Sequence, residues 1–326
     1  TEDGKTTVQI ELDYPAKTQG PVIEEMVRAK LVEAGIPADV KISQNIIAHE
    51  VQRGVKVFDS VRNIIAVSSG KGGVGKSTVS ANLALALQQE GAKVGLLDAD
   101  VYGPSQPTML GITDKPYSVD GKTLEPMVAH GLQVASVGVL IDPDQPMIWR
   151  GPLAVSALQQ LLKQTNWKDL DYLIVDMPPG TGDIQLSLSQ EVPLTGAVVV
   201  TTPQDIALMD ARKGLVMFEK VNVPILGIIE NMATHICSKC GHEEHIFGEG
   251  GAAKMAAQYG VELLGELPLD INIRLSMDKG EPIVISDPDS KVAQAYREIA
   301  RKLAVAVSKK NKDYSAKMPS IKVSDT

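Results

Sequence analysis

A glycine-rich loop is the feature that most constrains this chain. The loop reads Gly70-Lys71-Gly72-Gly73-Val74-Gly75-Lys76-Ser77-Thr78, and it follows an apolar run over residues 63–69. It fits the Walker A pattern, in which backbone N–H groups turn onto phosphate oxygens. In that pattern Lys76 neutralises the β- and γ-phosphates and the Ser77 hydroxyl coordinates Mg²⁺. The loop therefore predicts a nucleoside triphosphate site at a strand–loop–helix junction.

The same glycines also fit a dinucleotide-binding fingerprint, G-x-G-x-x-G, through Gly70, Gly72 and Gly75. An acidic residue, Asp98, follows about 20 residues later, as that fingerprint requires. Two observations favour the triphosphate interpretation. A dinucleotide loop has no use for Lys-Ser after its last glycine. In addition, the apolar segment 172–176 ends in Asp176, which is placed as a Walker B residue that holds Mg²⁺ through water.

Two further aspartates, Asp98 and Asp100, come directly after the apolar segment 93–97. Aspartates at such a position often only stabilise a turn. Near a γ-phosphate, however, a carboxylate can orient the attacking water. We therefore expect Asp100 to position water and Asp98 to lie near the Mg²⁺ shell. The glycines and threonine of segment 177–183 are candidates for sensing the γ-phosphate.

Apolar runs and helical patterns alternate from residue 63 onward, which predicts an α/β fold with a mostly parallel sheet flanked by helices. A shorter strand–helix–strand pattern precedes it and predicts a small α+β domain. We expect domains at 1–60 and 61–310 and a flexible tail at 311–326. The expected strands and helices of the larger domain are strands 63–69, 93–97, 132–139, 172–176, 197–202, 225–230 and 263–267 and helices 76–90, 152–165, 205–220, 251–259 and 287–306.

Composition narrows the function classes. The net charge of −8 is unfavourable for general nucleic-acid binding, which usually leaves a basic footprint. No apolar run approaches the roughly 20 residues that span a bilayer. The first residues, Thr1 to Gly4, have no basic or apolar region of the kind that begins a secretory signal. We expect a cytoplasmic protein without nucleic-acid or membrane partners.

The only two cysteines, Cys237 and Cys240, are separated by two residues. They are compatible with a zinc site completed by His242 and His245, although these histidines crowd the chelate. A redox pair is a second interpretation, but such pairs usually open a helix. Half of an iron–sulfur site is a third, because a symmetric dimer supplies the four thiolates that a cluster needs. The residues alone leave zinc and a bridged cluster open.

Several motifs taken together resemble one family. Residues 71–78 resemble the deviant Walker A of the MinD/ParA/ArsA and nitrogenase iron-protein class. With this loop and the cysteine pair, four further segments resemble the Mrp/ApbC family of iron–sulfur cluster carrier ATPases over residues 60 to 310. These segments are Asp98-Ala99-Asp100-Val101-Tyr102-Gly103-Pro104-Ser105, Asp176-Met177-Pro178-Pro179-Gly180-Thr181-Gly182-Asp183, Thr201-Thr202-Pro203-Gln204 and Glu230-Asn231-Met232.

The resemblance implies roles for particular residues. Lys71 would reach the phosphates bound by the other subunit of a homodimer, while Lys76 holds its own nucleotide. Asn231 would read the adenine, and Pro268 would line the base pocket. Cys237 and Cys240 of two subunits would bind one bridging [4Fe–4S] cluster and pass it to apo-proteins. The first 60 residues resemble a shortened iron–sulfur assembly domain but contain no cysteine.

The main hypothesis is therefore a homodimer that binds and slowly hydrolyses ATP with Mg²⁺, carries a [4Fe–4S] cluster, and works with apo-proteins and assembly scaffolds. One alternative is a partitioning or positioning ATPase switch, which needs a basic surface or an amphipathic tail. Segment 309–326 is partly basic but lacks an apolar face. A zinc-binding P-loop ATPase and a dinucleotide-dependent oxidoreductase are the remaining alternatives.

Overall fold

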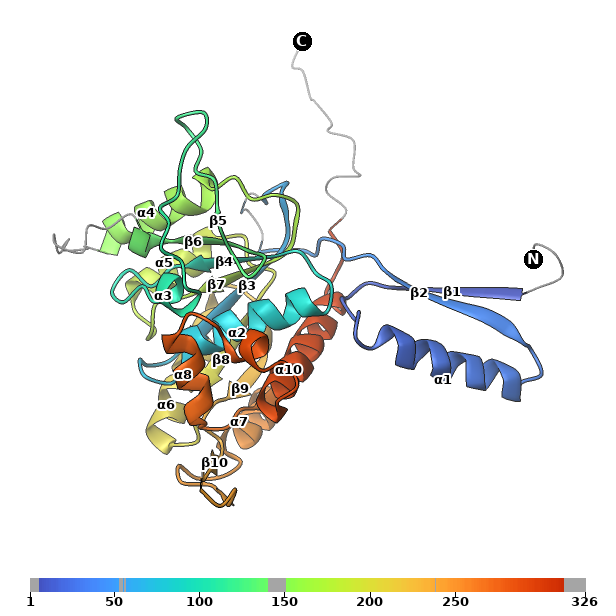
Figure 1. The fold of residues 1–326 in the computed structure, drawn as a ribbon. Coiled ribbons are helices and arrows are strands. Elements are labelled where there is room, and N and C mark those ends of the chain that lie inside the picture. The colour runs from blue at the N-terminus through green and yellow to red at the C-terminus, as the bar shows by residue number, and fades with distance from the viewer. Residues whose placement is uncertain (1–5, 53–54, 56, 140–150, 238, 314–326) are drawn as a thin grey trace, which may run out of the picture.

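The computed structural model describes residues 6–52, 55, 57–139, 151–237 and 239–313. A large body built around one sheet carries a small N-terminal unit that projects from its side (Figure 1). None of the described helices is both long enough and apolar enough to cross a bilayer.

The large body contains an eight-stranded sheet in the order β12-β9-β8-β3-β7-β4-β6-β5. Every neighbouring pair is parallel except β5 and β6, which are antiparallel. This confirms the mostly parallel α/β fold. The strands are β3 (Val61–Ser69), β4 (Val94–Asp98), β5 (Met127–Ala129), β6 (Leu132–Ser136), β7 (Leu170–Asp176), β8 (Gly196–Thr201), β9 (Ile225–Glu230) and β12 (Leu263–Glu266).

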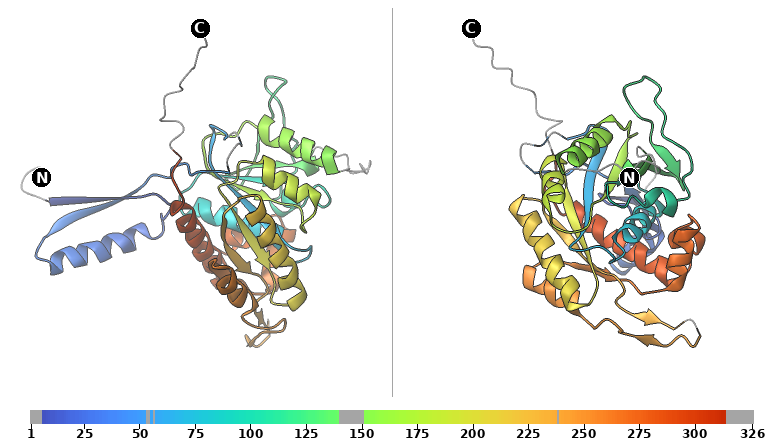
Figure 2. Two further views of the ribbon diagram at one scale, coloured as in Figure 1. Left: turned by 180° about the vertical axis from the view of Figure 1, so that it is seen from behind. Right: turned by 90° about the vertical axis from the view of Figure 1, so that its left-hand side faces the viewer.

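Helices cover both faces of this sheet (Figure 2). Along β3, Ile65 and Val67 belong to one apolar core, and Ile64 and Ala66 belong to the other. A strand buried on both faces reads as a continuous apolar run, which explains why these strands were predictable. The first face carries α2 (Lys76–Gln89), α8 (Ile271–Asp278), α9 (Ile283–Ser286) and α10 (Lys291–Ser308), and the second carries α4 (Gly151–Gln164), α5 (Asp183–Glu191), α6 (Asp205–Lys220) and α7 (Gly251–Tyr259).

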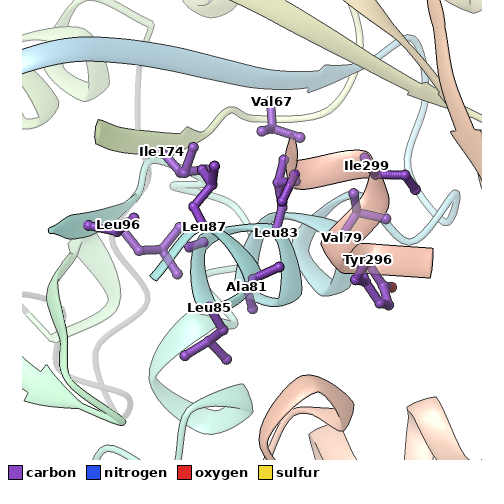
Figure 3. Packing of buried hydrophobic residues seen from close by; sticks show 14 of the residues in the cluster. Val67, Val79, Ala81, Leu83, Leu85, Leu87, Leu96, Ile174, Tyr296 and Ile299 are labelled. Atoms are coloured by element: carbon purple, nitrogen blue, oxygen red, sulfur yellow. The ribbon is translucent and has the colours of Figure 1, made fainter. Parts of the chain in front are cut away.

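Helix α2 lies at the centre of the first core. Its sequence is rich in alanine and leucine, which favour helix, and 10 of its 14 residues are buried. Figure 3 shows its side chains between those of the sheet, such as Val67 and Ile174, and those of α10, such as Tyr296 and Ile299. The helix is therefore enclosed by sheet on one side and helix on the other.

The N-terminal unit consists of β1 (Thr6–Leu12), α1 (Gly20–Glu33) and β2 (Ala38–Gln44), with the two strands parallel. No residue of α1 is buried. The unit is attached at the C-terminal end of α2, where the buried Glu90 carboxylate accepts hydrogen bonds from the Thr18 backbone N–H (3.0 Å) and hydroxyl (2.7 Å). Arg301 of α10 forms an ion pair with the same carboxylate at 2.8 Å.

Some elements have no counterpart in the sequence prediction. These are the edge strand β5, the short helix α3 (Gln106–Met109), the helices α5, α8 and α9, and a hairpin of β10 (His235–Ile236) and β11 (Glu243–Glu244). The predicted strand 132–139 ends at Ser136 and continues as a 3₁₀ turn. Residues 314–326 of the predicted tail lie outside the described residues, while the Asn311 carbonyl accepts a hydrogen bond from the Glu50 backbone N–H.

Candidate nucleotide and metal-binding site

The glycine loop connects β3 to α2, and close packing requires glycine at two of its positions. Gly75 has φ +81°, and a Cβ there would lie 2.3 Å from Nδ2 of Asn231. A Cβ on Gly70 would lie 2.2 Å from the backbone carbon of Asp210. The loop is thereby held against two neighbouring segments, and the first N–H groups of α2 are left at its end without helical partners. Such an end binds phosphate groups.

The Walker A lysine and the Walker B aspartate form an ion pair. Lys76 Nζ lies 2.6 Å from Oδ1 of Asp176, and the two side chains are 5% and 0% exposed. The Ser80 hydroxyl lies 2.9 Å from the same oxygen, and Nε2 of Gln106 donates to Oδ2 at 2.9 Å. Strands β3 and β7 are neighbours, so their carboxyl ends bring these predicted residues together.

Asp98 organises the loop that follows β4. Its Oδ2 accepts hydrogen bonds from the backbone N–H groups of Ser105 (3.0 Å) and Gln106 (3.1 Å) and from the Ser136 hydroxyl (3.0 Å). Burial and, after it, the nearby Asp176 carboxylate raise the pKa of Asp98 to about 7. The sequence suggested turn stabilisation as an alternative for this aspartate, and the observed hydrogen bonds show that Asp98 has this role.

Asp100 is the most exposed of the three site aspartates, although only 8% of it is accessible. Its Oδ1 accepts hydrogen bonds from the backbone N–H groups of Tyr102 (3.2 Å) and Gly103 (3.3 Å). Burial raises the pKa of Asp100, and the Lys76 ammonium partly offsets that effect. Asp100 therefore lies in the same charged cluster as Lys76 and Asp176, and its role in positioning water stays a prediction.

The oxygen atoms of this cluster fit a hydrated Mg²⁺ ion, which prefers oxygen ligands and keeps several waters. Ser77 Oγ lies 3.2 Å from Lys76 Nζ, beside Asp176. Lys76 forms an ion pair with Asp176, and its ammonium also acts on the Asp100 carboxylate. The buried Oε1 of Gln106 has no hydrogen-bond partner among the described residues. Ser77 and Asp176 are thus the residues that would hold the metal, together with phosphate.

The two residues assigned to the base pocket follow neighbouring strands. Asn231 comes after β9, is buried, and donates from Nδ2 to the Val74 carbonyl at 2.8 Å. Pro268 comes after β12, which is parallel to β9, and is half-buried. Asn231 therefore buttresses the phosphate loop. Its contact with adenine, and that of Pro268, stay predictions.

Lys71 lies in the glycine loop and is half-buried. Its carbonyl accepts a hydrogen bond from the Ser69 hydroxyl at 2.9 Å. No ion pair or side-chain hydrogen bond of its ammonium occurs within the described ranges. The described residues therefore do not neutralise this charge.

Cys237 and Cys240 lie in the turn of the β10–β11 hairpin. The turn is closed by hydrogen bonds from Cys237 N to the His242 carbonyl (2.9 Å) and from Gly241 N to the Cys237 carbonyl (2.8 Å). Hydrogen bonds from the backbone N–H of Lys239, and then from Cys240, lower the pKa of the Cys237 thiol. A thiolate is the form that binds metal, and both cysteines are accessible.

The zinc alternative needed His242 and His245 beside the cysteines. His245 instead has its Nδ1 3.0 Å from the Ala233 carbonyl. Within the described part of the chain, no three His, Cys, Asp or Glu residues are grouped as a metal site. The part of the chain that the structure describes thus offers two accessible thiols on a hairpin rather than a complete set of ligands.

Sequence comparison identifies relatives over most of the chain. Residues 60–304 match the family model ParA, described as NUBPL iron-transfer P-loop NTPase. The iron–sulfur cluster carrier protein of Salmonella typhimurium is 55% identical over 303 residues, which cover 91% of this chain and 82% of the relative.

Structure comparison gives the same class of fold. A nucleotide-binding protein from Archaeoglobus fulgidus, solved in complex with ADP, matches with a TM-score of 0.63 and 37% identity over 72% of this chain and 92% of that one. The cell division ATPase MinD of Pyrococcus furiosus matches with a TM-score of 0.58 and 25% identity over 74% and 98% of the two chains. Both matches support the P-loop NTPase architecture.

Proposed function

Because this chain belongs to the ParA family of NUBPL iron-transfer P-loop NTPases, we propose that it is an ATPase that carries an iron–sulfur cluster to apo-proteins. The observation that carries the proposal is the Cys237/Cys240 hairpin, which presents two accessible thiols, one with a lowered pKa. The 55% identical Salmonella relative is named an iron–sulfur cluster carrier, which supports the same function.

The proposed ATPase activity rests on the buried charged residues around Lys76 and Asp176. The start of α2 binds the phosphates of ATP, and Lys76 exchanges its bond to Asp176 for the β- and γ-phosphates. Ser77 and Asp176 hold Mg²⁺, which when bound neutralises charge on the transferring phosphoryl group. Asp100 orients the attacking water and, with its raised pKa, accepts a proton more readily than an ordinary aspartate.

The cargo half requires a second copy of the chain. A cluster of the [4Fe–4S] type takes four thiolates, and the chain has two cysteines. A two-fold axis that passes between two hairpins provides four. The hairpin follows β9 at the carboxyl edge of the parallel sheet, which is also the edge that carries the glycine loop. Lys71 has no ion pair among the described residues, which supports a homodimer in which it reaches the partner's phosphates.

ATP hydrolysis is slow, because the buried Lys76–Asp176 ion pair must open in each cycle. The ATP cycle then controls the binding and release of the iron–sulfur cluster. The carrier works in the cytoplasm with apo-proteins and assembly scaffolds. The division into 1–60, 61–310 and 311–326, with the first part as a shortened iron–sulfur assembly-type domain, belongs to this proposal. The projecting β1-α1-β2 unit supports that division.

Anaerobic reconstitution followed by iron, sulfide and molar-mass measurements tests the carrier function. We expect about four irons per dimer, from one cluster held by four thiolates. Cys237→Ala should lose the cluster and its visible absorption, whereas Lys239→Ala, in the same exposed turn, should retain both. A Cys237→Ala protein with full cluster content, or tight NAD binding without affinity for ATP, would refute the proposal.

A further inference from the structure

Gln106 is a residue of the nucleotide site that no motif singled out. It is fully buried and is the first residue of the short helix α3. Its Nε2 lies 2.9 Å from the Ser77 carbonyl and 2.9 Å from Oδ2 of Asp176, and its backbone N–H donates to Asp98. One side chain thus connects the Walker A helix, the Walker B strand and the loop that follows β4.

The other end of the same amide has no partner. Gln106 Oε1 is buried and makes no hydrogen bond to any described residue. Turning the amide over does not help, because Oε1 would then face the Ser77 carbonyl and the Asp176 carboxylate, which are both acceptors. A buried acceptor without a donor is costly and is expected to receive one from water or a ligand.

We infer that Gln106 is a positioning residue for the metal, with Oε1 accepting a hydrogen bond from a water of the Mg²⁺ shell. Mg²⁺ keeps several waters in such sites, and these waters are strong donors. Ser77 and Asp176, the residues that would hold the ion, are the two residues that Nε2 of Gln106 contacts. The inference rests on the proposed Mg²⁺–nucleotide function.

This arrangement gives Gln106 a role in both states of the site. Without nucleotide, the Asp176 carboxylate is held by Lys76, Ser80 and Gln106. When Lys76 turns to the phosphates, Gln106 still fixes Oδ2 of Asp176 and therefore the direction in which that carboxylate meets the metal. Because its backbone N–H is bonded to Asp98, the loop over residues 98–106 becomes sensitive to the metal.

The test compares ADP affinity with Mg²⁺ and with EDTA by calorimetry. Gln106→Leu, which keeps the approximate volume, should lower the Mg²⁺/EDTA affinity ratio about 5- to 10-fold, as expected for loss of one charge-assisted hydrogen bond. The affinity in EDTA should change less than about twofold. Gln52→Leu is the matched control, because Gln52 is also buried but, among the described residues, its side chain bonds only to backbone groups of Ser189, Val192 and Leu194.

An unchanged ratio in Gln106→Leu would overturn the inference while leaving the proposed function intact. A wild-type protein that binds no nucleotide would instead refute the proposed function. If Gln106→Leu does not fold, amide hydrogen exchange of the wild type decides the matter. Residues 98–109 should be better protected in ADP with Mg²⁺ than in ADP with EDTA, and equal protection would overturn the inference.

Discussion

Replacing the Walker A lysine should weaken the fold as well as abolish nucleotide binding. Lys76→Ala removes the ammonium 2.6 Å from Asp176 and leaves a carboxylate of 0% exposure with only hydroxyl and amide partners. The nearby Asp98 carboxylate repels the Asp176 carboxylate electrostatically. Removing one partner of a buried ion pair costs about 3–5 kcal/mol, because the remaining charge stays buried without compensation. For a domain of this size, the melting temperature should fall by about 10 °C.

The measurement is urea or thermal unfolding in EDTA without nucleotide, so that ligand binding does not contribute. The loss should be larger at pH 8 than at pH 5.5, because the pKa of Asp98 is about 7, so the negative charge of Asp98 near Asp176 is largely removed at the lower pH. Lys93→Ala is the control. Its ion pair with Asp169 is exposed, at 62% and 58%, and such pairs contribute about 1 kcal/mol or less.

The double variant Lys76→Ala/Asp176→Asn separates charge from packing. It should recover part of the lost stability, because the uncompensated charge is gone. A Lys76→Ala protein as stable as wild type at pH 8 would refute the reasoning. Such a result would mean that water reaches Asp176 and that the site is not closed in the absence of nucleotide.

Three further predictions concern other parts of the chain. The pKa of Asp98 is raised from 3.8 to about 7, so the contribution of this group to the stability of the fold is fully present below pH 3.8 and is lost as the pH rises to 7. Unfolding in EDTA should show a fall in the free energy of unfolding of up to about 1.4 kcal/mol per pH unit from this group, and Asp98→Asn should remove this fall. A wild-type stability that rises steadily from pH 5 to 7 would contradict the prediction. Gly75→Ala should destabilise the protein by about 1–2 kcal/mol in chemical unfolding and weaken ATP binding, because its φ is +81° and its Cβ would meet Asn231, whereas Gly72→Ala, whose Cβ has open space, should unfold like wild type. Thr18→Val removes a hydroxyl bonded to Glu90 and should increase proteolysis within residues 6–44 without changing the melting of the large body; equal proteolysis rates would show that this bond does not hold the unit.

Sequence reasoning succeeded where one strong pattern decides the outcome. The strands buried on both faces are continuous apolar runs, so 225–230 and the run that ends at Asp176 were placed correctly. The Walker A and Walker B patterns assigned Lys76 and Asp176 to one nucleotide site, and the two side chains form an ion pair there. Position at or shortly after the carboxyl end of a strand was sufficient for these residues, because the carboxyl ends of parallel strands share one edge.

The rest depends on contacts between distant segments. Strand β5 has three residues and exists only because it pairs with β6, so it carries no pattern of its own. The partners of Gln106 lie 29 and 70 residues away, and no local rule assigns a role to a glutamine before a proline. The raised pKa of Asp98 likewise comes from burial and from Asp176, which enter only through the fold.

Because α2 is enclosed by the sheet and α10, it determines which parts of the molecule are able to change conformation when nucleotide binds. A helix packed between a sheet and α10 cannot slide or rotate without repacking both layers, and close-packed interiors resist such changes. Loops move more readily and on shorter timescales. In a mutational scan, substitutions along α2 should therefore appear as reduced protein abundance, whereas those at the exposed positions of segments 98–106 and 177–183 should give abundant protein with an altered response to ATP. We expect α2 to keep its position while the loops over residues 98–106 and 177–183 change conformation.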